Sequence, residues 1–159
     1  MTLLCKYQRC ERGTAAIEAV FVLPFLVLIG FGAVDGSLFM MQNHKVENGL
    51  VSAGNYLAKT QTPTLFEGTA KRLATTGQIS SGGDKKVKNW NEGDVSITYI
   101  DTANTETETG RSYRGGDTIK VVKLSTNVPF QGLGFLKSVS GGTLTIKASY
   151  EERLVAAQS

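Results

Sequence analysis

The chain has few of the side chains on which enzyme and metal sites depend, with one histidine and two cysteines among 159 residues. Cys5 and Cys10 both precede a long apolar run, so no cysteine remains to form a disulfide in the rest of the chain. His44 stands far from both, which leaves no metal-ligand spacing. A G-x-S-x-G motif and a glycine-rich phosphate loop are also missing. We therefore predict no enzyme activity, no metal and no cofactor, with chemistry by carboxylates alone as the one catalytic alternative left open.

Charge is scarce as well, and the net charge is +3. Lys6, Arg9 and Arg12 against Glu11 place +2 of it in residues 1–13, which leaves +1 for the remainder. Because residues 14–159 are so close to neutral, they have no extended positively charged surface of the kind that binds nucleic acid. The sequence therefore argues against nucleic acid as a partner.

The longest hydrophobic run, residues 14–34, contains a single charged side chain. As a helix with a rise of ~1.5 Å per residue it would be ~31 Å long, against a bilayer core of ~30 Å. Asp35 ends the run, since an ionised carboxylate is costly in lipid. The cations that precede the run put the N-terminus in the cytoplasm and the C-terminal part outside. The run is longer than the apolar core of a usual signal peptide, and no A-x-A site closes it. We therefore predict a transmembrane helix over 14–34, with both cysteines as reduced thiols on the cytoplasmic side.

Glu18 is the one charge inside the predicted span. At the bilayer centre an ionised side chain costs on the order of 2.5–3.5 kcal/mol, and less near the edge. Two interpretations stay open on the residues alone. Glu18 is either an interfacial residue stabilised by the helix N-terminal dipole, or a buried acid that awaits a positive partner.

The stretch RGTAAIEAVFVLPFLVLIGFGAVDGS resembles the N-terminal signature of TadE/TadF-like minor pseudopilins of Flp (Tad) type IV pili. In that family a basic leader ends in a glycine, a glutamate is the fifth mature residue, and a Leu/Val-rich span contains a Leu-Pro pair. The resemblance implies that residues 1–13 are a leader, cut by a prepilin peptidase between Gly13 and Thr14. It also implies that Glu18 neutralises the N-terminal amine of a neighbouring subunit. Ala19 stands where such prepilins commonly carry an aromatic residue.

The resemblance also implies what the protein does. We expect a structural minor pseudopilin that supports Flp/Tad pilus assembly and surface attachment. Its expected partners are membrane lipid, the prepilin peptidase, the major Flp pilin, and other pseudopilins or Tad assembly proteins. We expect it in the bacterial inner membrane with a periplasmic C-terminal domain, and at the cell surface where it is incorporated in the pilus. These residues do not separate TadE from TadF.

Three residues in the span bear on helix packing. Pro24 removes one backbone hydrogen bond and is expected to kink the helix, which membrane helices tolerate. Gly30 and Gly32 leave a thin surface that another helix could approach. These features suit a packed assembly without being specific to one.

Residues 35–159 are predicted to form one exported α+β domain. The helix should continue over 36–59, because apolar residues recur on one face, at Phe39, Val46, Leu50, Ala53 and Leu57. Pro63 breaks the pattern, and a second short helix is expected over 64–76. Alternation predicts strands that begin at Val95 and Leu144, and 119–124, apolar on both faces, predicts a central strand. We expect an antiparallel sheet of about three or four strands, an exposed loop over 101–116, and a Pro-aromatic turn at 128–130.

A single-span periplasmic binding module for a ligand or nucleic acid is the alternative. Its site would lie in the loops of 77–116, where Lys85, Lys86 and Lys88 stand near Trp90. A solvated turn anchored by one tryptophan explains the same residues without a ligand. Glu106 and Glu108 are in the same way expected to be solvated charges rather than an acid pair.

Overall fold

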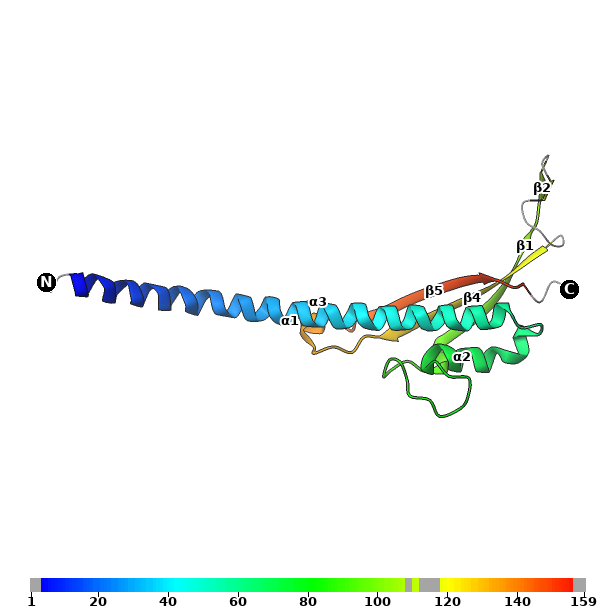
Figure 1. Ribbon diagram of the computed structural model, residues 1–159, viewed down its shortest axis with the longest axis horizontal. Coiled ribbons are helices and arrows are strands. Elements are labelled where there is room, and N and C mark those ends of the chain that lie inside the picture. Colours follow the sequence, from blue (N-terminus) through cyan, green and yellow to red (C-terminus); the bar gives the residue numbers. More distant parts are fainter. Residues whose placement is uncertain (1–3, 108–109, 112–117, 156–159) are drawn as a thin grey trace.

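A computed structural model describes residues 4–107, 110–111 and 118–155 (Figure 1). A single helix, α1 (Leu4–Ala58), contains 55 residues and passes through Pro24 without interruption. Its first half extends as a bare rod, and its second half is packed against a small α+β domain (Figure 1). Among the described residues, α1 is the one helix long and apolar enough to cross a membrane. The predicted long helix that joins a membrane span to a domain is confirmed.

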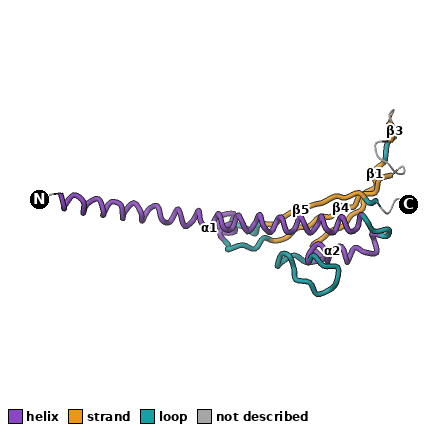
Figure 2. The backbone as a smooth tube through the Cα atoms, viewed as in Figure 1, coloured by secondary structure: helices purple, strands orange, loops and turns teal. Residues whose placement is uncertain are grey.

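The outer half of α1 buries the face that its periodicity predicts. Val46, Leu50, Ala53 and Leu57 are fully buried, and Phe39 packs against the same core. They contact α2 (Glu67–Thr76) and the sheet, which the view of Figure 2 places below and above α1 respectively. Two glycines on α1, Gly49 and Gly54, allow this close approach.

The second helix begins later than expected. The first helix already ends at Ala58, and Pro63 begins a 3-10 turn, η1 (Pro63–Phe66), before α2. Gly77 closes α2 in a left-handed conformation with φ 80°, and its N–H donates to the carbonyl of Leu73 at 2.9 Å. Glycine adopts this conformation without the steric cost that other residues meet.

Three antiparallel strands form the main sheet, in the order β1–β4–β5. They are β1 (Val95–Ala103), β4 (Thr118–Pro129) and β5 (Thr145–Arg153), so the strand predicted to be central is central. A 3-10 turn, η2 (Glu92–Asp94), leads into β1. Val122, Leu124, Val128 and Ile146 of the sheet are fully or almost fully buried in the core shared with α1.

Two predicted boundaries are wrong. The expected loop over 101–116 begins too early, because β1 continues to Ala103, which pairs with Thr118. The same segment contains a two-stranded ladder, β2 (Glu106–Thr107) with β3 (Gly110–Arg111). Threonine-rich polar sequence reads as loop by composition, yet threonine is favoured in strands when a partner is present. Glu108 lies outside the described residues, so the expectation for that acid pair stays a prediction.

The expected turn at 128–130 also lies further along the chain. Val128 still pairs with Ile146, and Pro129 is the last residue of β4, a position where a strand tolerates proline. The chain then forms a short helix that the sequence did not predict, α3 (Phe135–Ser140), between two glycines in left-handed conformation. This helix lies beside α1 at the point where the bare rod meets the domain (Figure 1).

Candidate assembly surface and membrane junction

The rod formed by residues 15–34 presents apolar side chains to its surroundings on every side. None of this window is buried by the rest of the chain. Its large apolar side chains are 47% to 70% exposed, and they include Val20, Phe21, Leu23, Phe25, Leu26, Ile29 and Phe31. Such a surface is stable only in lipid or against other apolar helices. The protein is therefore anchored in a membrane by this helix.

Glu18 is exposed on the rod and has no ion-pair partner within the described part of the chain. Gly13 and Thr14 lie on the backbone of α1, about one helical turn before it. Because Gly13 is helical, a peptidase that cuts after it would have to unwind this turn locally. Glycine costs a helix roughly 0.5–1 kcal/mol relative to alanine, which makes that unwinding easier.

The two glycines of the span have different surroundings. A Cβ atom built on Gly30 would meet nothing within 4 Å, so this position offers open backbone to a neighbouring helix. A Cβ on Gly32 would lie 3.1 Å from the ring of Phe135 in α3. Gly32 is thus already used for contact within the chain.

Asp35 is the buried acid that joins α1 to the rest of the domain. Its side chain is fully buried, and its carboxylate accepts hydrogen bonds from the N–H of Leu133 at 2.6 Å and of Leu136 at 2.9 Å. The bond from Leu136 lowers the pKa of Asp35, against the opposing effect of desolvation, and the N–H groups of 133–135 lower it further. Gly132 is required here, since a Cβ on it would lie 2.1 Å from the carboxylate. The sequence indicated only that Asp35 ends the span.

Two more turns of α1 extend this contact. The rings of Phe39 and Phe130 meet edge to face, with centroids 5.3 Å apart. Gln42 donates from its side-chain amide to the carbonyl of Gln131 at 2.7 Å. Together the contacts of Gly32, Asp35, Phe39 and Gln42 with segment 130–136 are called the junction below. The spacing of three, four and three residues places them on one face of α1.

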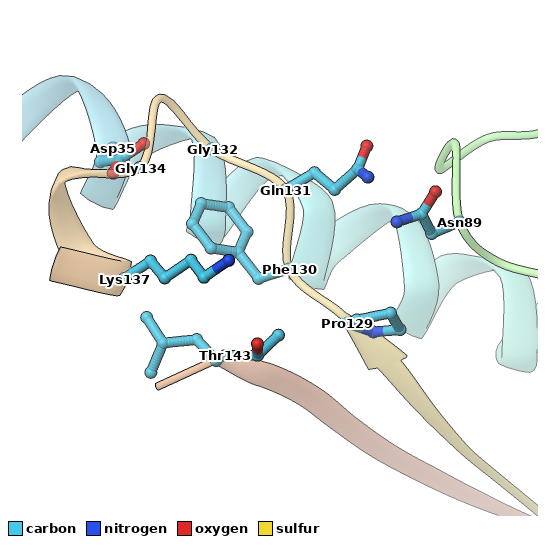
Figure 3. Close-up of a pocket in the computed structure, with 10 residues that line it drawn as sticks. Asp35, Asn89, Pro129, Phe130, Gln131, Gly132, Gly134, Lys137 and Thr143 are labelled. Atoms are coloured by element: carbon cyan, nitrogen blue, oxygen red, sulfur yellow. The ribbon is translucent and has the colours of Figure 1, made fainter. Parts of the chain in front are cut away.

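A cavity of about 440 Å³ opens beside the junction (Figure 3). Asp35 and Lys137 are the two charged residues among those that line it, together with Pro129, Phe130 and Thr143. Both carboxylate oxygens of Asp35 already accept backbone hydrogen bonds. The lining therefore supplies no free acid for proton transfer and no nucleophile paired with a base.

The loop proposed for ligand binding places its aromatic residue in the core. Trp90 is fully buried, and its indole N–H donates to the hydroxyl of Thr126 at 3.0 Å. That hydroxyl donates in turn to the carbonyl of Asp94 at 2.9 Å. The interpretation of Trp90 as an anchor is confirmed, and its ring cannot stack on a nucleic-acid base. His44 is a surface residue, 73% exposed and 3.5 Å from Glu47.

Residues 13–54 match the family model TadE, described as TadE-like protein. No curated protein and no solved structure matches the chain significantly. The matched segment starts at Gly13, contains Glu18 and the whole bare rod, and ends on the packed half of α1. The sheet and α3 lie outside it. Over residues 13–54 the chain is similar to TadE-like proteins, and this similarity, together with the apolar rod, supports a membrane-anchored protein related to the Tad pilus.

Proposed function

We propose that the protein is a structural minor pseudopilin, without enzymatic activity, that supports Flp/Tad pilus assembly and surface attachment. The observation that carries this proposal is the bare apolar rod with Glu18 exposed upon it, joined to a small domain through the junction. A subunit that enters a helical bundle needs an unpartnered helix, whereas a simple tether does not need the junction.

Processing by a prepilin peptidase between Gly13 and Thr14 belongs to this proposal. Cleavage would leave a positive amine on Thr14. Glu18 has no cation beside it in the described part of its own chain, and the amine of a neighbouring subunit would supply one. A carboxylate and an amine that pair in lipid remove two unpaired charges at once, so the pair would favour one register between subunits. The N-terminus would lie in the cytoplasm and the domain in the periplasm.

The mass of the intact chain isolated from membranes tests the processing step. We expect the wild type to begin at Thr14, and a Gly13→Leu variant to keep its leader. Gly36→Ala is the matched control, because Gly36 lies on the same helix with open space around it and outside the predicted leader. A wild type that begins at Met1 would contradict processing at this bond.

Glu18→Gln tests the assembly step separately. We expect this variant to be processed and folded normally but to be depleted from sheared pili and from detergent-solubilised complexes with other pilus subunits. Glu47→Gln, on the solvent-exposed part of the same helix, should leave incorporation unchanged. Equal incorporation of the two variants would remove Glu18 from the assembly contact and would favour a simple anchored binding module.

A further inference from the structure

The short helix α3 lies at the depth of the last turn of the membrane span. Phe135 covers Gly32, which precedes the end of the apolar run at Val34 by two residues. Two residues of helix correspond to about 3 Å. Asp35 holds the same segment through Leu133 and Leu136, so α3 cannot move along α1 without breaking both bonds.

The side chains that α3 and its flank expose are apolar. Leu133 is 61% exposed and Val139 is 71% exposed. In the last turn of the rod, which contains Gly32, Phe31 and Val34 are also 51% and 49% exposed, so α3 lies where the rod still presents apolar side chains. The domain core does not cover this surface.

The single cation of α3, Lys137, extends toward the domain (Figure 3). Figure 3 shows the side chain of Lys137 extending toward Phe130, and Phe130 packs on Phe39, which lies on the domain side of Asp35. A lysine on a membrane-seated helix extends its ammonium toward the polar side in the same manner. The carboxylate of Asp35, at the same level, is enclosed by backbone N–H groups and presents no free charge to lipid.

We propose that α3, with Leu133, is an interfacial foot that lies in the headgroup–acyl boundary of the outer leaflet of the membrane that the rod crosses. We assign lipid to this surface, because the membrane-spanning rod of the same chain and the junction bring it to the bilayer in every membrane-bound copy. Leu133 and Val139 insert among the lipids, and Lys137 extends toward the headgroups. The domain is thereby supported on the bilayer at two points, the rod and the foot.

Fluorescence quenching by spin-labelled lipid tests this proposal on the full chain in nanodiscs with one chain per disc. The two native cysteines are replaced by serine, and Val139→Cys carries an environment-sensitive fluorophore. Leu65→Cys is the matched control, because Leu65 is 79% exposed and lies in η1, beyond the distal end of α1. Unchanged circular dichroism and Trp90 emission verify the fold of both variants.

We expect lipid with a nitroxide near the headgroup to quench the label at position 139 and to leave that at position 65 unquenched. The label at position 139 should also emit at shorter wavelength. Equal, weak quenching at both positions would overturn the proposal. Protection of position 139 that arises only with several chains per disc, without lipid quenching, would assign the surface to a second copy and overturn it too. Neither outcome depends on cleavage at Gly13, so the proposed function stands or fails separately.

Discussion

Replacing Gly49 by alanine should destabilise the domain through a contact that leaves no room for a methyl group. A Cβ on Gly49 would lie 2.4 Å from the carbonyl oxygen of Ala74, and 2.6 Å and 2.8 Å from two ring atoms of Trp90. The carbonyl belongs to the backbone of α2 and the ring is fully buried, so neither can move without shifting its element. Overpacking of this kind costs about 1–3 kcal/mol, and the better helix propensity of alanine returns about 0.5–1 kcal/mol. We expect a net loss of about 1 kcal/mol.

The chain contains a single tryptophan, so urea unfolding of the detergent-solubilised protein can be followed by the emission of Trp90 itself. With a dependence of about 1–3 kcal/mol per molar urea, the midpoint should fall by about 0.5 M. Gly36→Ala is the control on the same helix, since its Cβ would meet nothing within 4 Å, and its midpoint should stay equal or rise. A Gly49→Ala midpoint as high as that of Gly36→Ala would refute the packing of α1 on α2 described above.

Three further perturbations address the junction and the core. The pKa of Asp35 is lowered from its ordinary value of 3.8, so its bonds to the 133–136 backbone stabilise the fold above that pH and are lost as pH falls through the lower folded-state pKa. The thermal unfolding midpoint of the wild type should therefore fall more steeply toward acid pH than that of Asp35→Asn. If the midpoints of the two proteins fell in parallel with pH, the role of the junction would be contradicted. Trp90→Phe leaves the buried hydroxyl of Thr126 without its donor and should lower the free energy of unfolding by at least about 1–3 kcal/mol, as measured by circular dichroism. Leu50→Ala should cost about 2–5 kcal/mol by the same measurement, whereas Met40→Ala, at a side chain that is 67% exposed, should stay within about 0.5 kcal/mol.

The parts of the structure that depend on neighbours in sequence could be predicted from it. Apolar residues at helical spacing identify the buried face of α1, because a helix returns Val46, Leu50 and Leu57 to the same side whatever they pack against. Alternating apolar and polar residues around Ile146 identify the strand β5 in the same way. The length and hydropathy of the apolar run are sufficient to predict the membrane span.

The junction could not be predicted, because its partners are far apart in the chain. Asp35 is bonded to backbone N–H groups 98 and 101 positions away, and every residue type has such a group except proline. Gly132 is a sequence signal for the junction, because a glycine next to apolar residues can mark a place where another group closely approaches the backbone. The extended ends of β1 and β4 were missed for a related reason, since Ala103 and Thr118 are held in strands by each other.

The junction also fixes the angle at which the domain faces its surroundings. Because α1 runs unbroken from Glu18 to Asp35, seventeen residues later, the two side chains are separated by a set rotation of about 260° at 3.6 residues per turn. A neighbouring subunit that contacts Glu18 therefore determines the orientation of the sheet and of the β2–β3 ladder about the axis of α1. Adding one residue between the two positions would turn that orientation by about 100° and leave both the anchor and the domain intact.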